Sequence, residues 1–430
     1  MSSLNWLNNL KNNIKNFFGL NRMSKNFIIF SNVHLGFLMF YTLQLVFMNT
    51  LLRRFSNGNG IIYLYNMVFF SFIPVGMTLA SFSIKKIQSI FTMKSSLYLW
   101  IGILAITLAL IVTKQLNHFW MLLAFIASIA NGCYWIAYYM ALTDYTDLYN
   151  RDIGLSIIGI YTAIANILVP LIGGYIINSF KNYTGYIIMF SIAFLVAIFS
   201  IIETNKLIVP KSESKKDNNE DSSIHLIVAI KSIFHDKIWL FSSLSEFFRG
   251  TRDGVFIFLL NILIFSVTQN EALVGINAFI AGSINIISNW VLGKLLYKNP
   301  QQNNKVKLLT ISVSCLFASS FLLLIKLNVT TLIILTCINA FFTIFIQNIT
   351  QSVFCLSVQI NEESNKLKAE SFVLKSYFLA FGRLVGIILM MFVPETNIYI
   401  SFGIIFLTIL QSFTVITAKK TIQLIDEYIK

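Results

Sequence analysis

The chain contains twelve apolar runs that are each long enough to cross a lipid bilayer as a helix. A transmembrane helix needs about 20 mostly apolar residues to span a hydrocarbon core about 30 Å thick. The first six runs cover residues 30–52, 61–82, 95–113, 119–142, 154–178 and 185–202, and the next six cover 238–265, 272–293, 308–326, 329–354, 372–393 and 398–417. The runs therefore predict an all-α membrane protein with twelve transmembrane helices.

The composition excludes a soluble globule. Only 12% of the residues are charged and 56% are apolar, whereas soluble proteins carry about 25% charged residues. The formal net charge is +14, but the basic residues fall between the apolar runs and form no patch for nucleic acid. The protein is therefore expected to face membrane lipids and to bind no nucleic acid.

The basic residues also predict the topology. Most of the 32 Lys and Arg residues fall on one side if both termini are cytoplasmic, and the three at 366–375, with Lys375 among them, are counted there. This bias is expected for a multi-pass protein of a bacterial plasma membrane. The predicted parts are an amphipathic N-terminal segment (1–29), a six-helix bundle (30–202), a cytoplasmic linker (203–237), a second six-helix bundle (238–417) and a cytoplasmic tail (418–430).

The two bundles resemble each other at a nearly constant offset of 208 to 216 residues. The matched pairs are Asn49 and Asn261, Lys86 and Lys298, Asn131 and Asn339, and Tyr161 and Tyr377. This pattern predicts a duplicated unit, with two bundles related by a pseudo-twofold axis. Parallel repeats of this kind place the substrate site between the halves near the middle of the membrane.

Four charged residues lie inside the apolar run 238–265. These are Glu246, Arg249, Arg252 and Asp253, and helical spacing places them within about a 120° arc. Each charge at mid-membrane costs about 2.5–3.5 kcal/mol on insertion scales, so such residues usually have a function. We interpret Glu246 or Asp253 as the proton carrier and the two arginines as substrate ligands; a structural ion pair is the alternative.

Other polar residues inside the runs are predicted to line the same cavity. They are His34, Tyr41, Gln44, Asn131, Trp135, Tyr138, Asn339, Thr343, Gln347 and Arg383. For the uncharged residues, hydrogen bonding between helices is an equally good interpretation, and for Trp135 so is packing. Arg383 lies in the middle of run 372–393 and is predicted to bind substrate or to pair with a carboxylate of run 238–265.

Several segments resemble the major facilitator superfamily. The segment VPLIGG, which contains Pro170, Gly173 and Gly174, is similar to the proline-glycine motif of helix 5 in many antiporters. DLYNRDIG is similar to the acidic loop after helix 4, with Arg151 at the arginine position. GCYWIAYY, FFRGTRDGVFIFLL and AFGRLVGI resemble a poorly characterised branch from Gram-positive bacteria.

The resemblance implies two six-helix halves whose helices 1, 4, 7 and 10 line a cavity. It also assigns a gating role to Lys85, Lys86, Arg151, Pro170, Gly173 and Gly174. The loop SFSIKK departs from the superfamily, because it lacks the usual acidic residue, and Tyr297 stands at the acidic position of the second half. No carboxylate is therefore expected for the usual lock of the inward gate.

The sequence predicts a secondary transporter that works by alternating access. Proton-coupled export of a small amphipathic molecule or drug is the leading interpretation; uptake of a solute, lipid flipping and a non-transporting receptor or scaffold are the alternatives. Motifs for nucleotide binding or hydrolytic catalysis are lacking, and the four cysteines form no zinc or disulfide pattern. We therefore expect a monomer that is not an enzyme and holds no metal or cofactor.

Overall fold

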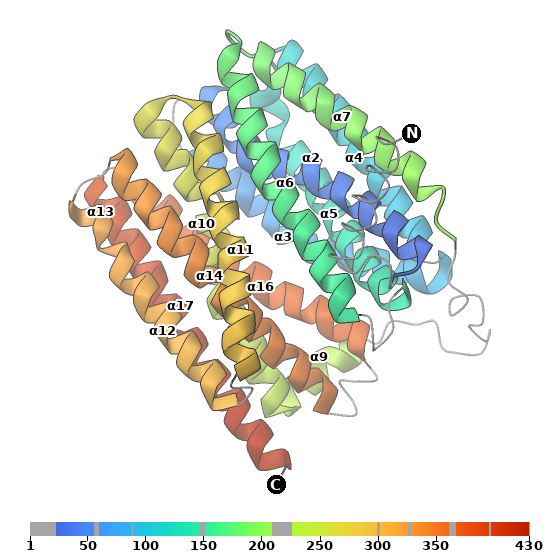
Figure 1. Cartoon of the computed structure of the whole chain (residues 1–430), viewed down its shortest axis with the longest axis vertical. Coiled ribbons are helices and arrows are strands. Elements are labelled where there is room, and N and C mark those ends of the chain that lie inside the picture. The colour runs from blue at the N-terminus through green and yellow to red at the C-terminus, as the bar shows by residue number, and fades with distance from the viewer. Residues whose placement is uncertain are drawn as a thin grey trace, which may run out of the picture.

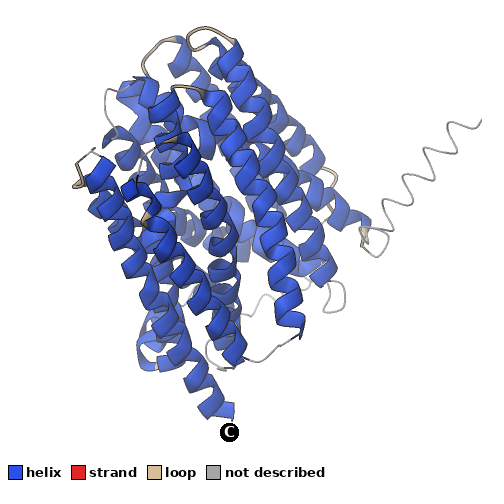
Figure 2. Cartoon of the chain, turned by 60° about the vertical axis from the view of Figure 1, so that its left-hand side comes forward, coloured by secondary structure: helices blue, strands red, loops and turns tan. Residues whose placement is uncertain are grey.

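The computed structural model describes residues 23–55, 60–87, 89–145, 151–208, 226–298, 302–325, 328–360, 367–394 and 397–429. Within these ranges every regular element is a helix (Figure 2). The helices form two groups that lie side by side, the earlier ones at the upper right and the later ones at the lower left of Figure 1. Residues 1–22 of the predicted amphipathic N-terminal segment and residues 209–225 of the predicted linker fall outside the described residues.

The first group contains α2 (Lys25–Phe55), α3 (Gly60–Ile87), α4 (Ser89–Val112), α5 (Leu116–Tyr145), α6 (Arg151–Ser179) and α7 (Thr184–Thr204). The second contains α9 (Leu226–His235), α10 (Lys237–Thr268), α11 (Glu271–Lys298), α12 (Gln302–Ser320), α13 (Leu322–Ile325), α14 (Val329–Ile360), α16 (Lys368–Met391) and α17 (Asn397–Ile429). The short helix α9 packs Ala229 and Ile233 against the second group and leaves Ile230 and Phe234 exposed.

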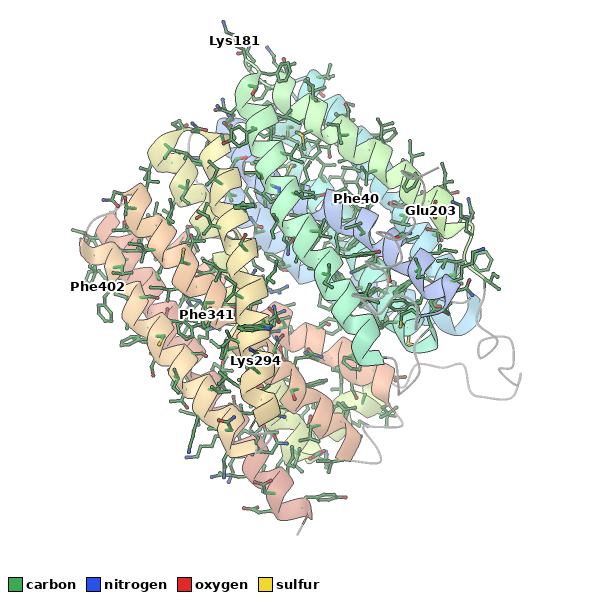
Figure 3. All side chains as sticks on the ribbon, in the orientation of Figure 1. Phe40, Lys181, Glu203, Lys294, Phe341 and Phe402 are labelled. Carbon is green, nitrogen blue, oxygen red and sulfur yellow. The ribbon has the colours of Figure 1, made fainter. Side chains whose placement is uncertain are left out.

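Twelve of the described helical stretches are long and apolar enough to cross a membrane, which agrees with the prediction. Large apolar side chains on the outside of the bundle confirm that it needs an apolar solvent. Leu195, Phe199, Trp290 and Ile398 are each about 60% exposed, and Phe402 points away from the bundle in Figure 3. Lipid is the solvent that accepts such a surface.

The last helix extends farther than predicted. We expected a tail from residue 418, but α17 continues to Ile429. Ala418 and Ile422 are buried beside Leu309 and Val313 of α12. Ala418 and Ile422 are four positions apart and so lie on one face of α17. They continue its apolar stripe past the charged pair Lys419 and Lys420.

Two glycine pairs bring α10 and α16 into close contact. Gly250 and Gly254 on α10 face Gly382 and Gly386 on α16. A Cβ atom on Gly382 would lie 2.0 Å from the Phe247 carbonyl oxygen, and one on Gly386 would lie 1.8 Å from that of Thr251. Glycines spaced by four residues permit such an approach between membrane helices, and here they bring the charged face of α10 next to Arg383.

The internal repeat recurs as a pair of hydrogen bonds between side chains. Asn66 on α3 donates to Asn49 on α2 over 2.7 Å, and Asn277 on α11 donates to Asn261 on α10 over 3.3 Å. Each residue lies 211 or 212 positions after its counterpart. The same contact thus joins the first two helices of each half.

Candidate functional site

A cavity of about 440 Å³ lies between the two halves. Its walls come from α2, α3 and α5 on one side and from α10, α14 and α16 on the other. Of the predicted site residues, Tyr41, Asn131, Trp135, Arg249, Asp253, Asn339, Thr343, Gln347 and Arg383 line it. We call it the cationic cavity because of its charged side chains.

The described residues that line the cationic cavity include three cations and one carboxylate: Arg249, Lys375, Arg383 and Asp253. An Nη atom of Arg249 lies 3.5 Å from an Oδ atom of Asp253. Arg383 lies over the Phe70 ring at 4.8 Å, and its Nε atom is buried without a hydrogen-bond partner among the described residues. The excess of positive charge suits a negatively charged ligand.

Glu246 lies behind this wall and is fully buried. Its carboxylate accepts hydrogen bonds from Arg249 over 3.0 Å and 2.5 Å, and its other oxygen lies 3.7 Å from Lys375 Nζ. Lys375 also donates to the Gln351 side chain. Glu246 thus anchors two of the cavity's cations, since a buried charge is stable only when it is paired.

Arg252 does not share the cavity-facing side of α10 that its spacing predicts. It donates to Asn339 Oδ1 over 2.7 Å and to Thr408 Oγ1 over 3.2 Å, and it stacks 3.6 Å from the centre of the Phe256 ring. Asn339 itself lines the cavity. Arg252 therefore contacts a lining residue of the cavity through its bond to Asn339. The 120° arc is wide enough that α14 and α17 cover the edge on which Arg252 lies.

Three predicted site residues of the first half, His34, Gln44 and Tyr138, lie inside that half instead of on the cavity wall. His34 bonds the Tyr134 hydroxyl at 3.1 Å and stacks on Tyr138 at 4.3 Å between ring centres. Gln44 donates to the Tyr65 hydroxyl over 2.9 Å. These contacts match the alternative interpretation, in which polar groups join helices.

Lys375 is a wall residue that we counted among the cytoplasmic charges. It lies on α16 eight residues before Arg383, which places both cations on one face of that helix. That spacing is visible in the sequence and indicates the shared face. Tyr139 and Phe372 also line the cavity, and their rings stack across the halves at 6.1 Å.

Comparison with known proteins identifies the family. Residues 33–360 match the sequence profile described as Major Facilitator Superfamily. The chain belongs to the Major Facilitator Superfamily. Its members are membrane transporters and not enzymes, so this protein is a secondary transporter with a small-molecule substrate.

Similar proteins support the superfamily fold over most of the chain. The chain is 22% identical to the uncharacterized protein YqgE of Bacillus subtilis, covering 81% of this chain and 79% of that one. It resembles a solved D-xylose-proton symporter (TM-score 0.68, 13% identity, 90% and 96% of the chains). It also resembles the nucleoside transporter NupG (TM-score 0.66, 14% identity, 92% and 100% of the chains).

An ion pair joins the halves at the end of the bundle that the predicted topology places outside, which we call the outer end. Arg54 on α2 donates twice to Glu271 on α11, with Nη2 to Oε2 at 2.9 Å. The Tyr186 hydroxyl donates to the same carboxylate over 2.9 Å. Glu271 is fully buried. A superfamily transporter that opens at this end must break this pair.

The predicted gating glycines also lie near the outer end. A Cβ atom on Gly174 would lie 2.6 Å from the Glu271 carbonyl oxygen, and one on Gly275 would lie 2.3 Å from that of Pro170. Gly173 packs against Phe47 within the first half. Pro170 and Gly174 thus bring α6 against α11 across the halves. The turn that follows α6 carries Lys181, at the top of Figure 3. The side chains of Lys85, Lys86 and Arg151 lie outside the described residues.

Proposed function

We propose that this transporter moves a small organic anion together with a proton. The observation that supports this proposal is the cationic cavity, in which Arg249, Lys375 and Arg383 face one carboxylate among the described lining residues, that of Asp253. Arginine binds carboxylates, sulfonates and phosphates through paired hydrogen bonds. Tyr41, Trp135 and Tyr139 provide an aromatic wall for the apolar part of the same molecule.

Asp253 would couple the proton to the anion. It lies 3.5 Å from Arg249, so a bound anion and an ionised Asp253 compete for the same guanidinium group. A proton on Asp253 removes that competition, and reciprocity requires that the anion in turn favours the proton. Two ligands that favour each other's binding travel in the same direction. An inward proton gradient would therefore drive uptake.

Export is a second candidate because Pro170, Gly173 and Gly174 resemble the antiporter motif of helix 5. An antiporter requires the proton and the substrate to exclude each other. With an anion as substrate, the Arg249–Asp253 contact instead favours binding of the proton and the substrate together. Proton-coupled export of an amphipathic drug therefore ranks behind anion uptake.

Proteoliposomes with a trapped pH indicator test this proposal. Small alkyl sulfonates and sugar acids are added on the acidic side, because sulfonates stay ionised and carry no proton through lipid. We expect anion-dependent proton entry with at least one of them and none with uncharged analogues. Proton entry that follows uncharged or cationic compounds instead would contradict the proposal.

Two substitutions should separate the roles of the charged residues. Arg383→Gln should weaken anion binding about tenfold or more, since a hydrogen bond to a charged group contributes about 1.5–3 kcal/mol. Asp253→Asn should keep anion exchange and lose acid-driven accumulation. Lys294→Gln is the matched control, because Lys294 lies over the Trp290 ring and does not line the cavity. Acid-driven accumulation by Asp253→Asn would exclude Asp253 as the proton carrier.

A further inference from the structure

A second cavity of about 270 Å³ adjoins the cationic cavity. It lies between α2 and α6 of the first half and α10, α11 and α14 of the second. Phe256, Ile257, Asn339, Thr343 and Gln347 line both cavities. A molecule held by the cations of the first cavity is therefore placed to extend into the second, which we call the amide chamber.

Among the described residues, those that line the amide chamber carry no charged side chain. Its own polar groups are carboxamides and hydroxyls, and they come from both halves: Thr42, Asn166, Asn261, Asn277, Asn285 and Thr336. A carboxamide both donates and accepts hydrogen bonds, as does a hydroxyl. The chamber is therefore complementary to an uncharged group that does the same, such as a row of hydroxyls.

Two polar atoms of the chamber are buried without a partner among the described residues. They are Oδ1 of Asn277 and Oγ1 of Thr336, on side chains that are 2% and 3% exposed. Buried polar atoms almost always have a hydrogen-bond partner. A ligand group in the chamber would provide the missing partner.

The internal repeat provides a comparison for Asn277. Its counterpart Asn66 donates to Asn49 over 2.7 Å and to the Ile62 carbonyl over 2.8 Å, and it lines neither cavity. Asn277 makes one longer bond, of 3.3 Å, to Asn261. The asparagine of the first half is thus held by two short hydrogen bonds, whereas its counterpart Asn277, which faces the chamber, is held by one longer bond.

We propose that the transported anion carries a polyhydroxyl part that occupies the amide chamber, so that the substrates are hydroxylated organic acids such as sugar acids. This inference rests on the proposed function, in which the cationic cavity holds the negative group. Asn277 and Thr336 select the hydroxylated part, while Arg249 and Arg383 hold the acid. The chamber thus distinguishes sugar acids from apolar acids of the same charge.

Calorimetric titration of the purified full chain tests this with matched probes. Gluconate and hexanoate share one carboxylate and six carbons but differ in hydroxyls. Glucuronate and cyclohexanecarboxylate are six-membered rings that each carry one carboxylate and differ in hydroxyls, and sorbitol has hydroxyls without charge. We expect each sugar acid to bind at least tenfold more tightly than its apolar partner and sorbitol to bind more weakly than gluconate. Equal affinity within both pairs would overturn the inference.

Substitutions in the chamber give a second measurement. Asn277→Leu and Thr336→Val keep the side-chain shape, and each should reduce the gluconate affinity about tenfold toward that of hexanoate while hexanoate binding is unchanged. Asn66→Leu is the matched control: it should lower the melting temperature and leave the gluconate-to-hexanoate ratio intact. Parallel losses for both acids in Asn277→Leu would contradict the selection by Asn277.

The two proposals fail in different ways. If both acids of a pair bind equally and both need Arg383, the anion site stands and the chamber assignment is wrong. If sorbitol binds as tightly as gluconate and Arg383→Gln changes neither, the anion function is wrong. If none of the five probes binds, the chamber assignment is overturned, and the anion function is overturned as well if the alkyl sulfonates produce no proton entry in the proteoliposomes.

Discussion

Replacement of Glu271 by Gln should open the outer end of the transporter, increasing the outward-open population about 30-fold. Glu271 is fully buried and accepts two hydrogen bonds from Arg54 and one from Tyr186. Arg54 belongs to the first half and Glu271 to the second. The pair therefore stabilises the state closed at this end and contributes nothing to a state in which the halves separate there.

The expected size of the effect follows from the burial of the two partners, because Glu271 is fully buried and Arg54 is not. Removing one partner of a fully buried ion pair costs about 3–5 kcal/mol. The Arg54 side chain is 35% exposed, and Gln keeps one acceptor for it, so the cost falls to about 2 kcal/mol. At about 1.4 kcal/mol for each factor of ten, this gives roughly the 30-fold shift.

Labelling of a cysteine in the amide chamber measures this shift. Ala278 lines the chamber, so Ala278→Cys, with the native cysteines replaced, reports access from outside to a membrane-impermeant maleimide in intact cells. Glu271→Gln should speed labelling, and Tyr186→Phe should speed it less because it removes one neutral donor. Glu203→Gln is the control, since its partner Lys206 lies in the same half. Equal labelling rates for Glu271→Gln and the unsubstituted chain would rule out this pair as a gate.

The sequence was sufficient for the helices and for part of the site. The twelve transmembrane helices follow from comparing the length of each apolar run with the thickness of a bilayer. The apolar segments on either side of the α10 charges are each too short to span a bilayer, so these charges had to lie inside one helix. Arg249 and Asp253 were found because a helix has a fixed period. The inner gate predicted from Lys85, Lys86 and Arg151 stays a prediction.

Contacts between distant parts of the chain were harder to predict from the sequence. Lys375 was counted with loop charges because it is near the start of its run, and only its partners Glu246 and Gln351 show that it belongs to the cavity. The helical spacing of Arg252 and His34 predicts that they face the cavity, but side chains of neighbouring helices cover them. The Arg54–Glu271 pair joins residues 217 positions apart, and no local pattern encodes such a contact.

Replacement of Gly386 by Ala should separate α10 from α16 and destabilise the folded chain by about 3 kcal/mol, the upper range for overpacking. The added Cβ atom would lie 1.8 Å from the Thr251 carbonyl oxygen. A backbone atom within a helix cannot move away alone, so the whole helix must shift. Gly382→Ala meets the Phe247 carbonyl oxygen at 2.0 Å and should act in the same way.

This helix pair also positions the charges, because Gly254 packs on the Cβ and Cγ atoms of Arg383. Gly386→Ala should therefore weaken binding of the preferred anion as well as lower the melting temperature. Gly102→Ala and Gly159→Ala are the matched controls, since a Cβ atom at either position meets nothing within 4 Å. They should leave both the melting temperature and anion binding unchanged. If Gly386→Ala behaves like these controls, α10 and α16 do not pack through their glycines and the close approach that unites Asp253 with Arg383 is wrong.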